Sequence, residues 1–500
     1  MAIISSIASW LLKRRIYEIA LYKDYPHQVQ FECFINLIQT AEKTEWGLRY
    51  DYENIEDVST FRERVPINSY EDLQPFFDRM RKGEEDILWP GSIKWFAKSS
   101  GTTSSKSKFI PVSEEALEDC HFKGGKDLLA VYHEAYPEAE FLSGKTIGVA
   151  GSVQQDEDGE AYTGDLSAIL MSNLPIWAHF SKAPKLAIVV MNEWEEKLEK
   201  IVEHTIDEDI RSISGVPSWM LVILRRALEV SGKKYVKDLW PNFELVVHGG
   251  VSFTPYRKQF EDICGPDVNY QEVYNASEGF IAMQDDFERD DMLLMLDYGI
   301  FYEFLPMDQL GVENPKAIGL EEVELGETYA LVISTNAGLW RYLIGDTVVF
   351  TSLKPFRIKI NGRTKSFINA VGEELVVENA DQAILHACEH TQAVISEYTA
   401  APIYFSEGKK AAHEWLIEFD TEPKDIEVFN EYLDNALKML NSDYEAKRYH
   451  GMILQEPIIR ILPKGTFLKW LAANNRLGGQ YKVPRLSNDR KIVDEILALV

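Results

Sequence analysis

Cysteine is scarce in this sequence. Among 500 residues there are four cysteines, namely Cys33, Cys120, Cys264 and Cys388. No two of them form the closely spaced pairs that hold structural zinc or a redox disulfide. A disulfide framework and a cysteine-rich metal site are therefore excluded, and a reducing compartment, the cytoplasm, is expected.

Long apolar runs are also missing. The longest one near the start of the chain is Ala2–Leu12, whereas a membrane-spanning helix needs about 20 apolar residues. The basic cluster Lys13–Arg15 follows this run, but a secretory signal carries its positive charge before the apolar stretch. We expect no membrane insertion and an amphipathic first helix, with peripheral contact at a membrane surface as the minor alternative.

Positive charge is in short supply as well. The formal net charge is −28 at pH 7, and nucleic-acid binding requires clustered cations that displace counterions. Nucleic acid is therefore not an expected partner, and an anionic ligand must bind where positive charge is locally concentrated. One such basic segment is Lys464–Lys491, which holds seven lysine or arginine residues and one aspartate.

What the chain does contain is ample material for a core. It is 45% hydrophobic and 12% aromatic, and at roughly 100 to 200 residues per domain its length predicts more than one domain. Helical patterns such as Ser218–Leu228 occur together with strand-like runs such as Glu244–Gly250 and Thr328–Thr335. This mixture predicts an α/β fold.

The pattern changes near residue 360. Beyond it, short strand-like and helical stretches alternate, and one helical face is marked by Leu433, Ala436, Leu437 and Leu440. We predict a large N-terminal domain over residues 1–360 and a small C-terminal α+β domain over residues 361–500. The two are expected to join at a turn formed by Asn361 and Gly362.

An unusual loop stands at Ser99–Val112, with the sequence SSGTTSSKSKFIPV. Such a loop is either a flexible connection or a cradle whose hydroxyl and N–H groups hold phosphate oxygens, and its strand-like flanks favour the cradle. The Walker template is absent, because Lys106 stands where its second glycine belongs. The sequence SGKT at Ser143–Thr146 also fails, since Ala139 replaces the first glycine. A Walker-type NTPase is therefore excluded.

Four further motifs follow this loop in order. They are VHGGVSF at Val247–Phe253, EVYNASEGF at Glu272–Phe280, RYLIGD at Arg341–Asp346 and INGRTKSFINAVGEEL at Ile360–Leu375. Each motif is weak evidence by itself. Together, and in this order along the chain, the loop and the four motifs resemble five segments of the acyl-adenylate-forming enzymes. These segments are the phosphate loop, the turn that borders the adenine, the aromatic-x-x-Ser/Thr-Glu segment, the Gly-Asp motif and the hinge.

Within that superfamily the chain most resembles one family. The SSGTT and YNASE forms, with GTFLKW at residues 465–470 and GGQYKVPR at residues 478–485, are similar to those of the acyl acid amido synthetases. These enzymes, of the Gretchen Hagen type, were first known as auxin-responsive proteins in plants and join a carboxylic acid to an amino acid. The chain is shorter than plant members and has Leu343 where many relatives have arginine, so it is identified as a short, bacterial-type member. The resemblance implies a large α/β adenylation domain, with β-sheets flanked by helices, and a small mobile C-terminal lid.

The resemblance also implies an ATP site spread over these motifs. Hydroxyl, backbone and ammonium donors to the phosphates would come from Ser99, Ser100, Gly101, Thr102, Thr103, Ser104 and Lys108. The adenine and its surroundings would be bordered by Gly249, Gly250, Val251, Tyr274, Asn275, Ala276 and Ser277. Asp346 would accept from the ribose hydroxyls, and Arg363 would reach the ribose and phosphates from the hinge.

Two residues are implied to be catalytic. Glu278 would bind Mg²⁺, since a hard cation that bridges phosphates takes one or two carboxylates. Lys482 lies in the basic segment, beside two glycines, and would swing into the phosphates for adenylation and leave for the second step.

Each assignment has a plainer alternative. Glu278 and Arg363 could be exposed turn residues, Tyr274 a core aromatic and Lys482 a solvated lysine. Ser277 lies in a near miss to the hydrolase nucleophile elbow, but the first glycine of that motif is absent, which argues against a serine hydrolase.

The leading hypothesis is an ATP-dependent ligase. It adenylates a carboxylic acid with ATP and Mg²⁺ and transfers the acyl group to an amino acid amine. The alternatives are an acyl-CoA ligase with the same first step and a non-catalytic nucleotide-binding protein, against which the presence of Glu278, Asp346 and Lys482 speaks. Trp219, Val251 and Ser252 are expected to line a pocket for a small aromatic or aliphatic acid. The enzyme is expected to be a monomer or homodimer.

Overall fold

A large mixed sheet organises the N-terminal part of the molecule. The computed structural model describes residues 14–99, 108–156, 159–191, 194–250, 253–363, 367–404, 410–448, 453–474 and 483–500. Over these residues the sheet has eleven strands in the order β12-β13-β14-β15-β11-β10-β9-β8-β7-β3-β6. One half is parallel and the other antiparallel, and β9 belongs to both halves.

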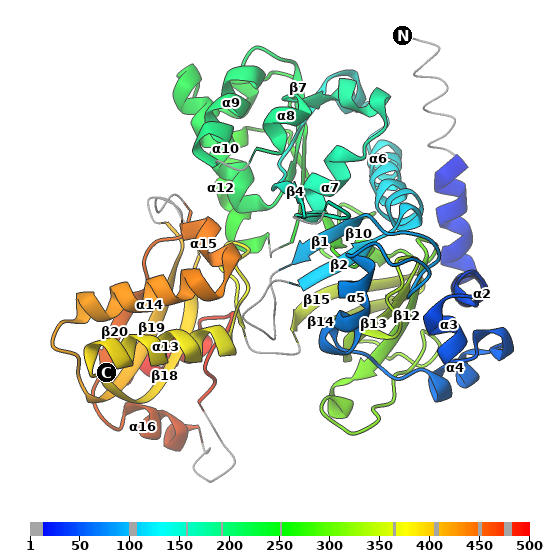
Figure 1. Cartoon of the computed structure of the whole chain (residues 1–500). Coiled ribbons are helices and arrows are strands. Elements are labelled where there is room, and N and C mark those ends of the chain that lie inside the picture. The colour runs from blue at the N-terminus through cyan, green and yellow to red at the C-terminus, as the bar shows by residue number, and fades with distance from the viewer. Residues whose placement is uncertain are drawn as a thin grey trace.

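The parallel half is built from strands linked by helices. Its strands are β3 (Lys145–Gly148), β6 (Lys182–Ala183), β7 (Ile210–Gly215), β8 (Leu245–Gly249) and β9 (Asn269–Ala276). Its longer helices, which form the top of the molecule in Figure 1, are α9 (Trp194–Thr205), α10 (Pro217–Ser231) and α12 (Thr254–Cys264). The predicted helix at Ser218–Leu228 is confirmed as α10. It begins at Pro217, which has no N–H to leave unpaired, and ends before Gly232 at φ +66°.

The antiparallel half carries the later motifs. Its strands are β10 (Gly279–Met283), β11 (Met292–Leu294), β12 (Ile300–Pro306), β13 (Thr328–Thr335), β14 (Tyr342–Leu353) and β15 (Phe356–Arg363). The strand predicted at Thr328–Thr335 is confirmed as β13, and all its residues after the first are buried. Continuous burial fits a strand covered on both faces.

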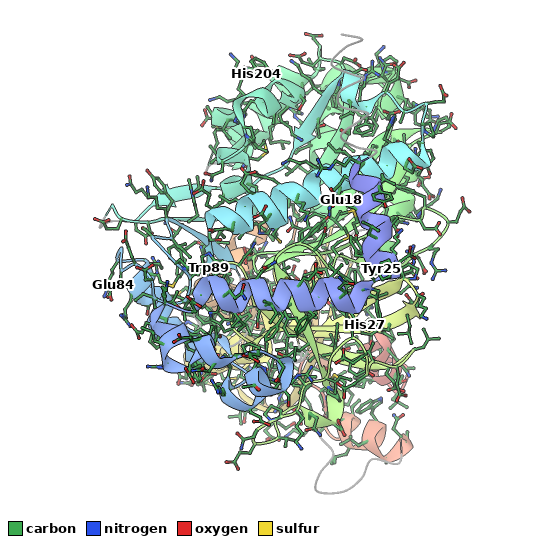
Figure 2. All side chains as sticks on the ribbon, turned by 90° about the vertical axis from the view of Figure 1, so that its right-hand side faces the viewer. Glu18, Tyr25, His27, Glu84, Trp89 and His204 are labelled. Atoms are coloured by element: carbon green, nitrogen blue, oxygen red, sulfur yellow. The ribbon has the colours of Figure 1, made fainter. Side chains whose placement is uncertain are left out.

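N-terminal helices cover the antiparallel half. They are α2 (Pro26–Ala41), α3 (Glu45–Arg49), α4 (Val58–Arg64) and α5 (Tyr70–Met80). Figure 2 shows the chain near Tyr25 and His27 leading into α2, which runs across this side. Phe34 of α2 packs against Phe301 of β12, with 5.0 Å between the ring centroids, so the helix is held by aromatic core contacts.

A second, four-stranded sheet has the order β2-β1-β5-β4. Its strands are β1 (Trp95–Ser99), β2 (Lys108–Val112), β4 (Val153–Gln155) and β5 (Tyr162–Gly164). The strand-like flanks of the hydroxyl-rich loop are thus confirmed as β1 and β2. After β2, the Ser113 hydroxyl accepts from the Ala116 N–H at 2.9 Å and starts a helix. This helix continues as a π-helix at Ala116–Phe122 and then as α6 (Lys123–Ala135).

The C-terminal part has its own three-stranded sheet, visible in yellow to red at the lower left of Figure 1. It consists of β18 (Val394–Ile403), β19 (Ala412–Thr421) and β20 (Ile458–Leu462). One face, with Trp415, packs against α13 (Val377–Thr391) and α14 (Ile426–Leu440). The other face, with Leu416, packs against α16 (Thr466–Ala473) and α17 (Lys491–Leu497), as the alternation of side chains along a strand requires.

Shorter elements complete the connections. They are α7 (Leu166–Ser172), α8 (Leu186–Val189), α11 (Val236–Leu239), α15 (Ser442–Arg448), β16 (Phe367–Ile368) and β17 (Leu375–Val376). Across the described ranges, no helix combines the length and apolar character needed to cross a bilayer. The amphipathic first helix expected at Ala2–Leu12 lies outside the described residues.

The turn predicted at Asn361 and Gly362 is wrong. Both residues lie inside β15, where Gly362 pairs with Thr347 and Ile360 with Val348, so Asn361 is the extra residue of a β-bulge. Asn-Gly favours a turn in a free backbone, but pairing with β14 gives the surrounding backbone groups their partners. β15 therefore runs across the boundary predicted after residue 360, and the division into two domains stays a prediction.

Candidate functional site

The Gly-Gly turn lies at the carboxyl end of β8, beside β9. Gly249 is the Cα partner of Val273 across these parallel strands. A Cβ at Gly249 would lie 2.4 Å from the carbonyl oxygen of Val273, and Gly250 has φ +81°. Gly249 is required because β9 lies too close for a side chain, and Gly250 is favoured because its backbone is left-handed. Ligands of parallel sheets bind at this edge, which places the turn where a nucleotide would lie.

The YNASE segment spans the end of β9 and the turn to β10. Ala276 pairs with Gly279, so Ser277 and Glu278 form the two-residue turn of a β-hairpin. Glu278 is half-buried in this turn. Its carboxylate is thus held on a short, tightly paired loop at the same edge of the sheet as Gly249.

The tyrosine and the aspartate of two distant motifs are in direct contact. The Tyr274 hydroxyl donates to Asp346 Oδ2 at 2.5 Å, and Asp346 is the Cα partner of Arg363 across β14 and β15. Tyr274 is 5% exposed and Asp346 is 7% exposed. Three strands separate β9 from β14 in the sheet, so only strong curvature of the sheet brings these motifs together.

This contact bears on the predicted role of Tyr274. Its ring belongs to the main hydrophobic cluster, as the plainer alternative proposed, and its hydroxyl also holds the carboxylate expected to accept from the ribose. A flat face for adenine stays a prediction.

The hydroxyl-rich loop closes the hairpin between β1 and β2. Ser99 and Lys108 are Cα partners at its ends, whereas Ser100, Gly101, Thr102, Thr103 and Ser104 lie outside the described residues. The Lys108 side chain is nearly buried, and its Nζ lies 5.5 Å from the centroid of the Tyr70 ring. The Tyr70 hydroxyl in turn accepts from the Phe109 N–H at 3.0 Å. Tyr70 thus supports the end of the loop, a role that no sequence motif indicated.

The residues predicted for the acyl acid pocket are only partly placed. Trp219 lies in the first turn of α10, where Lys447 Nζ is 4.6 Å from the centroid of its ring. Lys447 belongs to α15, so this contact joins the parallel half of the sheet to the C-terminal part. Val251 and Ser252 lie outside the described residues, as does Lys482. Their roles stay predictions.

A histidine that the sequence analysis missed contacts the YNASE segment. His121, in the π-helix, has Nδ1 2.9 Å from Asn275 Oδ1. Burial lowers the pKa of His121 to about 4, a shift that the bond to Asn275 partly opposes. The imidazole is therefore neutral near pH 7. A π-helix is rare and short, so sequence patterns seldom indicate one. His121 stands among charged residues, with Asp119 before it and Lys123 after it, so no apolar pattern or motif indicated it.

A second buried histidine, His248, directly precedes the Gly-Gly turn. Its ring stacks on Phe253 with 3.7 Å between centroids, and its Nδ1 has no hydrogen-bond partner in the described part of the chain. Burial, and then the charge of Arg257, lower its pKa to about 3. The imidazole is thus buried in its neutral form.

The low pKa of His248 predicts a specific loss of stability in acid. Because the unfolded chain binds this proton near pH 6.5 and the folded chain only near pH 3, the free energy of unfolding falls as the pH drops below about 6.5. His248→Phe keeps the ring stack but removes the titration. Between pH 7 and pH 5, urea unfolding of the wild type is expected to lose about 2 kcal/mol more than that of the variant. Equal losses in the two proteins would contradict the assignment.

Comparison with known proteins shows the family of this chain. The model of the GH3 family N-terminal domain matches residues 15–268, that of the central domain residues 293–363 and that of the C-terminal domain residues 378–491. Among curated relatives, the 4-substituted benzoates-glutamate ligase GH3.12 of Arabidopsis thaliana is 25% identical, over 91% of this chain and 92% of its own length. The indole-3-acetic acid-amido synthetase GH3.4 of the same plant is 24% identical, over 92% of this chain and 89% of its own.

Solved structures agree on the fold. The AtGH3.15 acyl acid amido synthetase in complex with 2,4-DB superposes with a TM-score of 0.60 at 17% identity, covering 94% of this chain and 93% of its own. A 2-hydroxyisobutyryl-CoA ligase in complex with 2-HIB-AMP and CoA superposes with a TM-score of 0.57 at 12% identity, and the match covers 95% of this chain and 92% of the ligase. These likenesses confirm the predicted acyl-adenylate-forming fold. Because the three family models together span most of its length, this chain belongs to the GH3 family.

Proposed function

We propose that this chain is an ATP-dependent acyl acid amido synthetase. It adenylates a carboxylic acid, with release of pyrophosphate, and then transfers the acyl group to the amine of an amino acid. The observation that carries the proposal is the contact between Tyr274 and Asp346. It brings together, across three intervening strands, two motifs that the proposal assigns to one nucleotide site. Two curated relatives, which match this chain along nearly its whole length, are named as a benzoates-glutamate ligase and as an indole-3-acetic acid-amido synthetase.

The chemistry divides into two displacements. In the first, a carboxylate oxygen bonds to the α-phosphorus of ATP and the bond to pyrophosphate breaks. In the second, the amine nitrogen bonds to the acyl carbon, the bond to AMP breaks and the nitrogen gives up a proton. Adenylation is needed because a free carboxylate is a poor electrophile and AMP is a good leaving group. The protein must neutralise charge on the phosphoryl oxygens, a role that suits Lys108 and the donors expected at Ser99–Ser104.

Within this proposal Asp346 holds the ribose and Arg363, opposite it on β15, reaches the ribose and phosphates. Lys482 supplies the mobile cation of the first step. A location in the cytoplasm and a monomeric or homodimeric state stay predictions from the sequence.

Mg²⁺ fits the carboxylate of Glu278. Across the described ranges there is no cluster of three or more His, Cys, Asp or Glu side chains that could hold a metal ion by itself. A Mg²⁺ ion at the hairpin turn would therefore share Glu278 with phosphate oxygens and water, the arrangement that this ion prefers. It would supply charge neutralisation at the phosphates.

Coenzyme A is the second candidate acceptor. The likeness in fold to the 2-hydroxyisobutyryl-CoA ligase favours it, since that fold serves thioester formation. The two candidates share the adenylation step and differ only in the nucleophile. We place the amino acid first because the relative named for an amino acid acceptor, glutamate, is 25% identical to this chain, whereas the CoA ligase is 12% identical.

The test is acid-dependent exchange of pyrophosphate into ATP with Mg²⁺, across aromatic, indolic and aliphatic acids. We expect exchange with a subset of small aromatic or aliphatic acids, followed by amide products of the matching mass when amino acids are added. Thioester products with coenzyme A and no amides would favour the second candidate. ATP binding without exchange for any acid would contradict adenylation and favour a non-catalytic nucleotide-binding protein.

A further inference from the structure

The π-helix after β2 is fastened to the β9–β10 hairpin. The Phe280 N–H donates to Cys120 Sγ at 3.2 Å. The helix that continues it also lies tight against the hairpin, because a Cβ on Gly124 would come within 2.6 Å of the Phe280 ring. His121 is therefore held at a fixed distance from the YNASE segment, and a π-helical turn of this kind often marks a functional site.

In the YNASE segment, the side chain of Asn275 is hydrogen-bonded to His121. An amide oxygen only accepts hydrogen bonds, so a neutral imidazole facing it must carry its proton on Nδ1. His121 is 4% exposed, whereas Asn275 is half-buried. The polar group of this pair that a reactant can reach is thus the Asn275 carboxamide.

Fixing a carboxamide decides which of its ends faces a ligand. The last torsion of asparagine is broad and nearly two-fold, so without a partner the oxygen and the NH₂ group exchange places at little cost. With Oδ1 bound to His121, Nδ2 is the end directed away from the imidazole. At this edge of the sheet lie Tyr274, Ser277 and Glu278, so an NH₂ group here meets the reactants of the proposed reaction.

We propose that His121 is a positioning residue that holds the Asn275 carboxamide so that its NH₂ group donates to an anionic oxygen of a reactant. The inference rests on the proposed function and deepens it. Two reactants offer this chemistry, namely the carboxylate of the acyl acid and the phosphates of ATP. Along β9, Asn275 points to the face opposite that of Tyr274 and its partner Asp346. The acid carboxylate is therefore the expected acceptor.

The experiment compares steady-state exchange kinetics of the wild type, His121→Phe, Asn275→Ala and the double variant. An anion loses about tenfold or more in apparent affinity when a donor to it is removed. We expect a KM for the acid about tenfold higher in Asn275→Ala, and a smaller rise in His121→Phe. The double variant should match Asn275→Ala, because His121 acts only through Asn275.

Two further variants separate positioning from folding. His121→Gln supplies an amide N–H donor in place of the imidazole and is expected to bring the KM for the acid to within about threefold of the wild type. His204 on α9, labelled at the top of Figure 2, is exposed, and its Nδ1 lies 2.9 Å from the carbonyl oxygen of Lys200 in the same helix. His204→Gln is the matched control and should change neither KM.

The outcomes are distinct. A rise confined to the KM for ATP would name the phosphates as the acceptor and support the donor role. Unchanged KM values in Asn275→Ala, or additive effects in the double variant, would overturn the inference. If the wild type shows no exchange, the proposed function fails instead, and the dissociation constants of ATP and of the acids in the panel, measured across the same variants, then decide the inference: a raised constant for either ligand in Asn275→Ala supports it, and unchanged constants for both overturn it.

Discussion

Asp346→Ala is expected to lower kcat/KM for pyrophosphate exchange by about 10²- to 10³-fold, or about 3 to 4 kcal/mol of transition-state stabilisation. Asp346 is nearly buried, accepts from Tyr274 at 2.5 Å and lies opposite Arg363. Its carboxylate is thus pre-positioned between two motifs. Removal deletes the acceptor proposed for the ribose hydroxyls and leaves the Tyr274 hydroxyl without this partner.

Tyr274→Phe is the matched control for this prediction. It removes the hydroxyl but keeps the ring in the core and the charge on Asp346, so a loss of no more than about tenfold is expected. Near-UV circular dichroism checks that both variants are folded. A folded Asp346→Ala protein whose exchange stays within about threefold of the wild type would show that the carboxylate does not hold the nucleotide.

Glu303→Leu is expected to lower the free energy of unfolding by about 3 to 5 kcal/mol, because it leaves the buried charge of Arg341 without its carboxylate partner. Glu303 on β12 is 1% exposed and accepts from Arg341 Nε at 2.9 Å and from Arg62 Nε at 2.9 Å. Arg341 is 4% exposed and has φ +42°. It begins the RYLIGD motif, so its anchor also fixes the start of β14, the strand that carries Asp346. Urea denaturation measures the change.

Two comparisons test the cause of that loss. Glu303→Leu combined with Arg341→Met removes the two most buried charges and leaves Arg62 with Glu322 as a partner. This variant is expected to recover most of the stability, since an apolar pair of similar volume replaces those two ions. Glu84, labelled in Figure 2, pairs with Arg79 at the surface, so Glu84→Leu should cost less than about 1 kcal/mol. If the double variant is as unstable as Glu303→Leu, the loss of unfolding free energy comes from packing around position 303 rather than from an unpaired buried charge.

The sequence was most informative where local pattern and burial coincide. The strand at Thr328–Thr335 and the helix at Ser218–Leu228 were predicted from apolar periodicity, and both are confirmed. The motif order indicated the acyl-adenylate-forming fold and the family, which the comparisons confirm. The turn at Asn361 and Gly362 failed because a local preference was outweighed by pairing with β14.

The sequence by itself therefore determined the α/β class, the positions of the few elements with a clear apolar pattern and the residues that carry the family motifs. Only the tertiary structure decided which of them touch. Tyr274 and Asp346 are 72 positions apart, and their bond depends on how far the intervening strands curve. His121 and Asn275 are 154 positions apart, and their bond depends on a π-helix held in place by packing. Periodicity reports whether a side chain faces the core, because burial repeats along one element; it carries no information about sheet curvature or helix register, which arise only when many elements pack together.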